Sequence, residues 1–436
     1  MEILHTNFTC TEMEIRMTEI LLGGILPLFL LSVGIYFLIY LKAYPLRSPQ
    51  KFCKALFSKG DDGDVSPMQA LLTALAGTLG VGNISGVAAA IALGGAGALF
   101  WMWICALFAM IIKYAEIVLA LSGKKGSRGG AMYYIKNKFP AMLFALFCLS
   151  CGFAMGNMTQ VKAAADAMET GFGGSGSIVA LLFALLLPPI LWKGKSGVFR
   201  FAQKAVPFMT VLYCSMAILH LFLCRHALPN AFLSIFRSAF SFRSVSGGFF
   251  GSALFLGMRY GACRGMISNE AGCGTAPIAH AASRNHPAAQ GCMGVAEVFI
   301  DTILLCTLTG LCVLVSPTET VQSGTALVVS AFASQFGNMA GYLLAPAMTI
   351  FAFATTVCWF YYSAECLYFI TGKSNFEKPL AILFSVLCPI ALLFSERSLL
   401  FTADLLICFM ALINLPTLCK HRRRILQETL AYFAKK

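Results

Sequence analysis

The sequence predicts an all-α protein that crosses a membrane many times, with two sets of five helices running in opposite directions through the bilayer. Three observations lead to this prediction. The 436 residues are 58% hydrophobic and only 12% charged, about half the charged fraction that soluble domains carry. The apolar residues form long runs. Two of these runs are interrupted by glycines, each at the start of one set. Soluble, disordered and fibrous proteins are thereby excluded.

Eleven apolar runs are long enough to cross a bilayer, which takes about 20 residues in a helix. The runs are continuous and lack the alternation of a membrane β-barrel strand, so we expect helices. The first run is too long for the apolar part of a cleavable signal peptide. In chain order the expected spans are residues 18–41, 68–94, 98–122, 141–165, 177–193, 205–224, 249–282, 291–316, 341–371, 379–395 and 398–419.

The basic residues predict how these spans are oriented. The chain carries 32 Lys and Arg against 19 Asp and Glu, a formal net charge of +13. With the N-terminus outside, most of the Lys and Arg residues fall in short inner loops and the C-terminal tail, as the positive-inside rule requires. We therefore expect a multi-pass protein of the cell membrane with its C-terminus in the cytoplasm. The positive charge then faces the lipid bilayer, and no nucleic-acid partner is expected. The oligomeric state stays open.

The first interrupted span contains the stretch Thr73-Ala-Leu-Ala-Gly-Thr-Leu-Gly-Val-Gly-Asn-Ile-Ser-Gly86. Glycines weaken a helix and let it unwind, and unwound backbone at membrane depth persists only where it lines a site. Its backbone groups would then be free to bind a solute. The alternative is close helix packing through the small residues Gly82 and Gly86.

The second interrupted span runs from Gly261 to Pro277. It carries Arg264, Asn269 and Glu270 in its middle, where a charge is costly and by default indicates function. We expect Arg264 to be the partner of Glu270. The alternative is that this is a structural ion pair that bridges the break.

Each interrupted span opens a set of five helices. Because five is odd, the two sets run in opposite senses, which indicates an inverted repeat with a substrate site near the bilayer midplane. Half-helix N-termini would face an anionic group such as a carboxylate, and freed carbonyls would face a cation. The expected divisions are an N-terminal segment with an extra transmembrane helix and a cytoplasmic loop (1–60), a first repeat (61–224), an extracellular connector (225–248), an inverted second repeat (249–419) and a basic cytoplasmic tail (420–436).

Several short stretches between about residues 60 and 419 have a recognisable pattern. They include Gly82-Asn-Ile-Ser-Gly-Val-Ala88, Gly97-Ala-Leu-Phe-Trp-Met-Trp103, Met132-Tyr-Tyr-Ile-Lys136, Gly156-Asn-Met-Thr-Gln160, Ser268-Asn-Glu-Ala-Gly272, Phe299-Ile-Asp-Thr302 and Trp359-Phe-Tyr-Tyr-Ser-Ala-Glu365. In sequence and order these stretches resemble the alanine/glycine:cation symporter family, also called the sodium:alanine symporters. The resemblance implies a LeuT-like fold of two inverted five-helix repeats. It also implies uptake of alanine, glycine or a similar small amino acid coupled to Na⁺, and no enzymatic activity.

The resemblance also implies which residues bind the amino acid. It points to the unwound stretch from Gly80 to Asn83, to Gln160, and to Thr355 and Trp359, which share a helix face at i and i+4. The polar groups of the second interrupted span complete the set. The candidate substrate-binding residues are Gly80, Gly82, Asn83, Gln160, Asn269, Glu270, Thr355 and Trp359.

A Na⁺ site is implied between the first and eighth core helices. The matching groups are the backbone carbonyls of Ala76 and Leu79 with the hydroxyl of Thr355 or Thr356. Carbonyls and hydroxyls are hard oxygen ligands of the kind that such cations prefer. For the two threonines the alternative is a hydrogen bond to their own helix.

Two acidic residues leave the coupling ion open. Glu297 and Asp301 are spaced i and i+4 on one expected helix, where like charges repel. Either one of them is protonated or a cation lies between them, so H⁺ coupling is an alternative to Na⁺ coupling. A membrane channel is a further alternative, whereas an intramembrane enzyme would need a catalytic constellation that the sequence does not show. Cys358 and Phe360 stand where Gly and Ser are usual in the family, which leaves the substrate size open.

Overall fold

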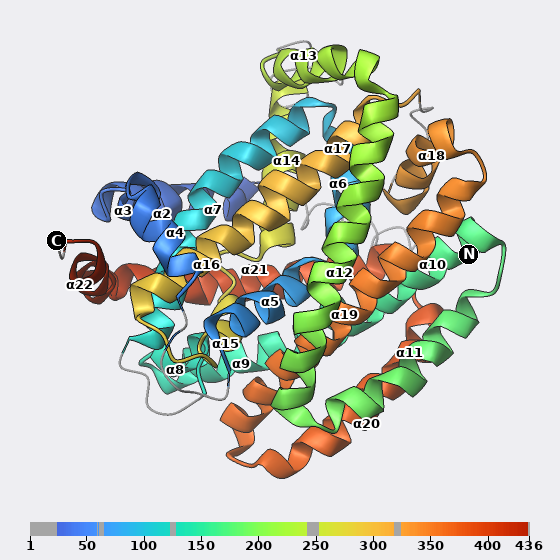
Figure 1. The fold of residues 1–436 in the computed structure, drawn as a ribbon. Helices are drawn as coiled ribbons and strands as arrows, with labels where there is room; N and C mark the ends of the chain where they lie inside the picture. The colour runs from blue at the N-terminus through green and yellow to red at the C-terminus, as the bar shows by residue number, and fades with distance from the viewer. Residues whose placement is uncertain are drawn as a thin grey trace, which may run out of the picture.

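The computed structural model of the protein describes residues 24–58, 60, 65–122, 128–241, 253–317 and 324–434. The regular structure of these residues is helical (Figure 1). Seven helices are long and apolar enough to cross a membrane, or eight if one bent pair counts as a single span, and three shorter helices are also apolar. The predicted all-α membrane fold is therefore confirmed.

Each expected span corresponds to a helix or a broken helix, although residues 18–23 of the first span and 249–252 of the seventh lie outside the described residues. The elements are α2 (Leu26–Tyr40), α5 (Pro67–Thr78) with α6 (Ser85–Gly94), α7 (Gly97–Leu121), α9 (Lys138–Phe153) with α10 (Gln160–Phe172), α11 (Gly176–Leu191), α12 (Gly194–Leu223), α14 (Ala253–Asn269) with α15 (Ala276–His280), α16 (Pro287–Val298) with α17 (Thr307–Leu314), α19 (Met339–Thr371), α20 (Glu377–Ile390) and α21 (Glu396–Lys420).

Several connecting segments contain helices of their own. They follow from local signals such as a proline at the first helical position, rather than from the hydropathy that predicts spans. These further helices are α3 (Tyr44–Arg47), α4 (Pro49–Leu56), α8 (Ala131–Tyr134), α13 (Leu228–Ala239), α18 (Gly324–Phe336) and α22 (Arg422–Phe433).

Two groups of helices form the interior. In the first, which we call the broken-helix bundle, α7 packs against α14 and α16, and α14 packs against α6. In the second, the scaffold group, α19 packs against α9 and α10, and α11 packs against α20. Figure 1 shows the two groups side by side. Because α5 contacts both α15 and α19, the first broken helix borders both groups.

The first broken helix bends by 65° between α5 and α6. A capping box of Ser66 and Gln69 starts α5. At its end the Gly80 N–H donates to Thr78 O at 2.8 Å, so the α-helical ladder stops there. The predicted break is present, but the chain then forms a 3₁₀ turn over Val81–Asn83 rather than an unwound stretch. The expected unwound stretch from Gly80 to Asn83 is therefore present only in part, because α5 ends at Thr78 and the chain rewinds after Leu79 and Gly80.

The second broken helix changes direction between α14 and α15. Glu270, Gly272 and Gly274 have φ angles of +52°, +86° and +78°, in the region that L side chains rarely adopt. Gly274 is also closely packed, since a Cβ atom there would lie 2.7 Å from the Ala131 side chain. Two glycines thus make the turn possible, while Glu270 adopts it without that freedom.

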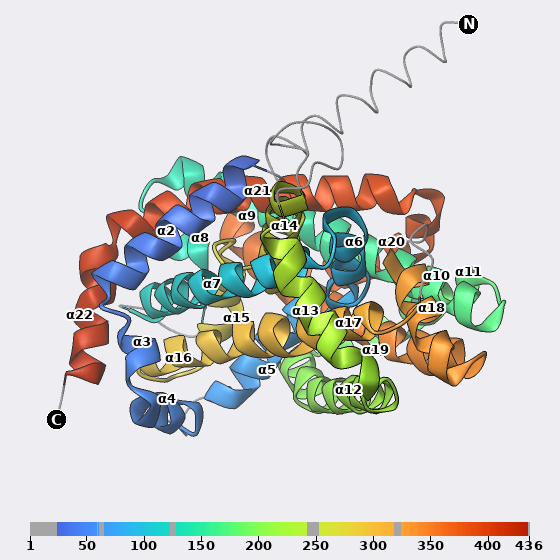
Figure 2. The same ribbon diagram turned by 90° about the horizontal axis from the view of Figure 1, so that it is seen from above.

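Loops rich in Lys and Arg gather at one end of the molecule, which we call the basic end. Lys51 Nζ donates to Phe433 O at 2.9 Å, and Asn285 Nδ2 donates to Ser58 Oγ at 2.9 Å. Figure 2 shows α3, α4 and α22 together at this end, away from α18. Segments expected in the cytoplasm are therefore grouped in space, and the orientation in the membrane stays a prediction.

Candidate functional site

A cavity of about 670 Å³ lies between the broken-helix bundle and the scaffold group. Gly80, Gly82 and Gln160 line it near the first break. Arg259 and Glu396 line it near the starts of α14 and α21, which lie away from the basic end. The cavity therefore reaches from the first break towards the end opposite to the basic end.

Gln160 is held against the first break by a turn of π-helix. Its Nε2 donates to Met155 O at 3.1 Å across residues 154–159, and its Oε1 accepts from the Val81 N–H at 3.3 Å. A Cβ atom at Gly80 would lie 2.9 Å from Gln160 Oε1 and 3.1 Å from Thr355 Oγ1. Glycine at position 80 thus allows two polar side chains to approach the backbone directly.

Three of the oxygens expected to bind a cation converge at the end of α5. Thr355 Oγ1 donates to Ala76 O at 2.9 Å and lies 3.4 Å from Leu79 O. The carbonyl of Ala76 is available because the Gly80 N–H donates to Thr78 O instead. A carbonyl pair and a hydroxyl are uncharged hard oxygens, so this donor set fits Na⁺.

Thr356 does not join this cluster, although it was a candidate ligand. Its hydroxyl donates to Ala352 O at 2.9 Å, one turn back on α19. This is the alternative that the sequence allowed for both threonines. Only Thr355 turns towards the first broken helix, because neighbouring residues on a helix point about 100° apart.

Trp359 lies next to this region but does not line the cavity. It is fully buried, and its side chain covers Gly156 so closely that a Cβ atom there would overlap the tryptophan. The neighbouring Cys358 Sγ donates to Thr73 O at 2.9 Å, and Phe360 packs edge-on against Phe384. Cys358 and Phe360 therefore do not line the cavity either.

Asn83 and Asn269 also lie outside the cavity lining and belong to a polar cluster around Asp301. Asn83 Nδ2 donates to Asp301 Oδ1 at 2.6 Å, and Ser268 Oγ donates to Asp301 Oδ2 at 2.8 Å. Asn269 Nδ2 donates to Thr302 Oγ1 at 3.2 Å. Asp301 thus joins the first broken helix to the second, although the sequence indicated only its spacing from Glu297.

The expected contact between Glu297 and Asp301 is wrong. Glu297 Oε1 accepts from Lys113 Nζ at 3.0 Å, and its Oε2 lies 3.1 Å from His280 Nε2. A π-helix from Phe299 to Cys306 follows directly and changes the rotation per residue, so the i,i+4 rule no longer holds. Each carboxylate has its own set of donors.

The pair of Glu297 and Lys113 extends to the basic end through two amide and ring contacts. Gln290 Nε2 lies 2.7 Å from His280 Nδ1 and donates to Pro67 O at 3.4 Å. The first residue of α5 is therefore connected to α15 and α16. His280 is fully buried in this network.

The expected pair of Arg264 and Glu270 is also wrong. Arg264 Nη1 lies 3.7 Å from Asp404 Oδ2 on α21, and both residues line the cavity. Glu270 Oε2 instead accepts from Thr275 Oγ1 at 2.6 Å, across the break. The left-handed backbone at Glu270 ends the helix that carries Arg264, so sequence spacing does not bring the two side chains together.

Sequence reasoning missed Glu116, which holds the second break from the side of α7. Glu116 Oε1 accepts from the Gly274 N–H at 2.9 Å and from Asn414 Nδ2, and Asn414 Nδ2 also donates to Gly272 O at 2.9 Å. Tyr134 OH donates to Asn414 Oδ1 at 2.6 Å. The signal available was an acidic residue within an apolar span, three residues after Lys113.

Sequence comparison places the chain among transporters. The model of the sodium:alanine symporter family matches residues 8–436. Among the relatives, the sodium/alanine symporter AgcS of Methanococcus maripaludis is 35% identical over 376 residues, which cover 81% of this chain and 82% of the relative.

Structural comparison gives the same fold. A point mutant of the manganese transporter of Eremococcus coleocola aligns with a TM-score of 0.59 at 11% identity, covering 83% of this chain and 82% of that one. MhsT in complex with L-phenylalanine aligns with a TM-score of 0.54 at 16% identity, covering 86% of this chain and 94% of that one. The LeuT-like arrangement of inverted five-helix repeats is thereby confirmed.

Proposed function

We propose that this chain, which belongs to the sodium:alanine symporter family, couples inward movement of Na⁺ to uptake of alanine, glycine or a similar small amino acid. The members of the family and the structural neighbours are transporters rather than enzymes. The observation that carries the proposal is that Gln160, which lines the cavity, and Thr355 both contact the first break.

Na⁺ binds first in the proposed cycle. Its ligands are the carbonyls of Ala76 and Leu79 and the hydroxyl of Thr355, whose Oγ1 already lies 2.9 Å from Ala76 O and 3.4 Å from Leu79 O. Without the ion, the Thr355 hydroxyl donates to Ala76 O and so links α19 to the end of α5. When Na⁺ is bound, the ion makes this link instead. Binding therefore orders the first break and joins the broken-helix bundle to the scaffold group.

The amino acid binds next to this ion. Its carboxylate meets backbone N–H groups between Gly80 and Asn83, where the Val81 N–H already points to an oxygen acceptor. Its ammonium group meets Gln160 Oε1. Thr355 and Trp359, which lie behind the cavity lining on the α19 side, support the wall that limits the size of the side chain, while Asn269 and Glu270 hold the second break.

Rocking of the broken-helix bundle against the scaffold group then opens the basic end. We propose that this end faces the cytoplasm of the cell, with the N-terminus outside, because the Lys and Arg loops gather there. Na⁺ and amino acid affinities are coupled by one free energy, so each ligand tightens the other by the same factor.

A proton is the alternative coupling ion, and Asp301 is the group that would carry it. This carboxylate is fully buried and bonded to both broken helices, so a change in its charge would act on both breaks. The Na⁺ proposal and the H⁺ alternative differ in the gradient that drives uptake.

Uptake of [¹⁴C]alanine by proteoliposomes separates these possibilities. We expect accumulation with an inward Na⁺ gradient, none when choline replaces Na⁺, and acceleration when unlabelled alanine is trapped inside. A channel would show no such acceleration. Uptake that ignores Na⁺ but follows an imposed pH gradient would replace Na⁺ by H⁺. Competition by glycine, D-alanine, glutamine and leucine then defines the substrate range, and we expect glycine to compete and leucine to fail.

A further inference from the structure

The segment from Arg128 to Tyr134, which we call the α8 strap, crosses the basic end of the molecule. It consists of Arg128, two glycines and the short helix α8. Three different parts of the broken-helix bundle and the scaffold group hold it in place. None of its residues belongs to the proposed substrate or Na⁺ site.

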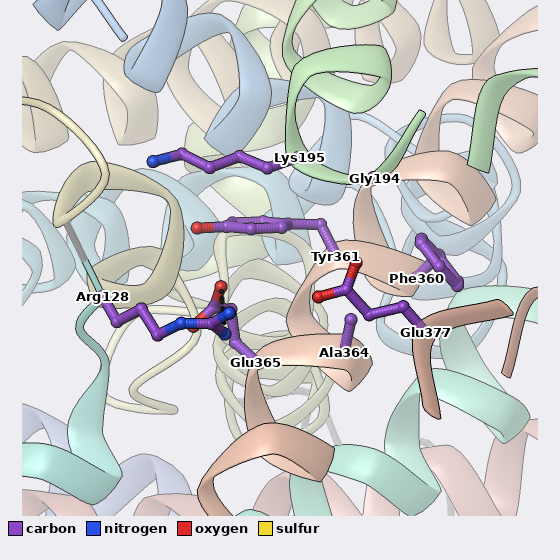
Figure 3. Close-up of a pocket in the computed structure, with 8 residues that line it drawn as sticks. All are labelled: Arg128, Gly194, Lys195, Phe360, Tyr361, Ala364, Glu365 and Glu377. Atoms are coloured by element: carbon purple, nitrogen blue, oxygen red, sulfur yellow. Dashed lines mark hydrogen bonds and ion pairs between the residues drawn. The ribbon is translucent and has the colours of Figure 1, made fainter. Parts of the chain in front are cut away.

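Arg128 attaches the α8 strap to the scaffold group. Its Nη1 donates to Glu365 Oε1 at 3.2 Å, and the carbon of its guanidinium lies 3.5 Å from the centre of the Tyr368 ring. Figure 3 shows the pair beside a small pocket of about 90 Å³, with Lys195 and Glu377 on other sides of it. Glu365 is only 6% exposed, so its charge depends on a close cationic partner.

Gly129 and Gly130 lay the α8 strap directly on the second broken helix. A Cβ atom at Gly129 would overlap Ala281, and one at Gly130 would lie 2.9 Å from the side chain of Ile278. Gly130 also has a φ of +141°. The α8 strap therefore covers α15, the half-helix of the second break that lies at the basic end.

Tyr134 connects the α8 strap to the second break itself. Its hydroxyl donates to Asn414, whose amide donates to Gly272 O and to Glu116. The α8 strap is thus bonded to α19 at its start, pressed on α15 in its middle, and linked to the second break at its end.

These contacts exist in a structure whose cavity reaches away from the basic end. We propose that Arg128 is a positioning residue of the transport cycle, which holds the α8 strap over α15 and keeps the basic end closed until the amino acid is bound. This inference rests on the proposed function. Opening of the basic end then requires Arg128 to leave Glu365 and Tyr368. The Arg128 side chain is 33% exposed, so water can replace its contacts at moderate cost.

Loss of the Arg128 contacts destabilises the state that is closed at the basic end, and therefore favours the state that is open there. Only the fraction of molecules open at the opposite end can bind external amino acid, so the apparent affinity falls with that fraction. Exchange of amino acid across the membrane does not need the closed state to be the more stable one. External KM and the ratio of net uptake to exchange therefore report on Arg128 separately from folding.

The experiment compares Arg128→Gln, Glu365→Gln and the charge-exchanged double variant Arg128→Glu with Glu365→Arg. Arg423→Gln, in an exposed basic residue of α22 at the same end, is the matched control. External KM for alanine uptake and Na⁺-dependent binding of external [³H]alanine to sealed proteoliposomes are measured, together with alanine counterflow. We expect both single Gln variants to raise KM and binding Kd about three- to tenfold with counterflow retained, and the double variant to return both values towards wild type.

Unchanged KM and Kd in both single variants, with a wild type that is active, overturns the inference. A double variant that folds, as judged by its elution and thermal melting, but binds no better than the singles also overturns it. Absence of Na⁺-dependent alanine uptake in the wild type contradicts the proposed function instead. The binding measurement keeps the test decisive for variants that transport poorly.

Discussion

Thr355→Ala is expected to weaken Na⁺ binding, whereas Thr356→Ala is expected to leave it nearly unchanged. The two residues are adjacent on α19 and both are buried. Their hydroxyls differ in direction, since Thr355 reaches Ala76 O at 2.9 Å and Thr356 bonds its own helix at Ala352 O. The comparison therefore isolates the direction of one hydroxyl from the general cost of losing a threonine.

The magnitude follows from the loss of one oxygen that faces the ion. A hydrogen bond to a charged group is worth about 1.5–3 kcal/mol, and each 1.4 kcal/mol corresponds to about tenfold in affinity. We expect Thr355→Ala to raise the half-saturating Na⁺ concentration by about tenfold to a hundredfold. Alanine affinity at fixed Na⁺ should fall as well, because the two bindings are coupled. Thr356→Ala loses only a bond within its own helix, so a change within about threefold is expected.

The assay is the Na⁺ dependence of [¹⁴C]alanine uptake by proteoliposomes, repeated as Na⁺-dependent binding in detergent. Both variants must elute as folded protein, so that reduced uptake reflects the site. Equal shifts for the two variants, or a larger shift for Thr356→Ala, would refute the assignment of Thr355 as the ligand and return Thr356 to consideration.

Four other substitutions test the first break and the buried charges. Gly80→Ala should reduce uptake more than about tenfold, because its Cβ would press on Gln160. Gly86→Ala should retain uptake, because the space around its Cβ is open. Equal activity of the two variants would contradict this geometry. Asn83→Ala should reach the membrane but lose uptake, and normal uptake would remove Asn83 from the site. Glu297→Gln leaves Lys113 buried without its carboxylate and should cost about 3–5 kcal/mol of stability, seen as a lower Tm in detergent; an unchanged Tm would show that the pair is dispensable.

Hydropathy and glycine content predict the spans and both breaks of this fold, because they act along a single helix. The Gly80 region is an example, since its glycines and its break are neighbours in sequence. Contacts between helices depend on rotation and depth, which spacing does not reveal. Arg264 therefore faces Asp404, from a distant part of the sequence, rather than the nearby Glu270.

Some residues of the candidate site could be predicted from the sequence, and others could not. The resemblance to a family indicated Thr355, Gln160 and the carbonyls at the end of α5, and the structure brings these groups together. Thr355, Trp359 and Asn83 do not themselves line the cavity. Glu116 escaped notice because its role depends on Asn414 from the far end of the chain, a partner that no local pattern identifies.

Gln290 connects the two broken helices at the basic end. Its amide contacts Pro67 O at the start of α5 and the ring of His280 on α15, so the two half-helices at this end share one bonded support. A movement of either half-helix therefore strains the contact that Gln290 makes with the other. We therefore expect α5 and α15 to move together when the basic end opens. Loss of the Gln290 contacts would uncouple α5 from α15. The ion and the amino acid would then leave in separate steps, and the Na⁺ gradient would drive no accumulation of the amino acid.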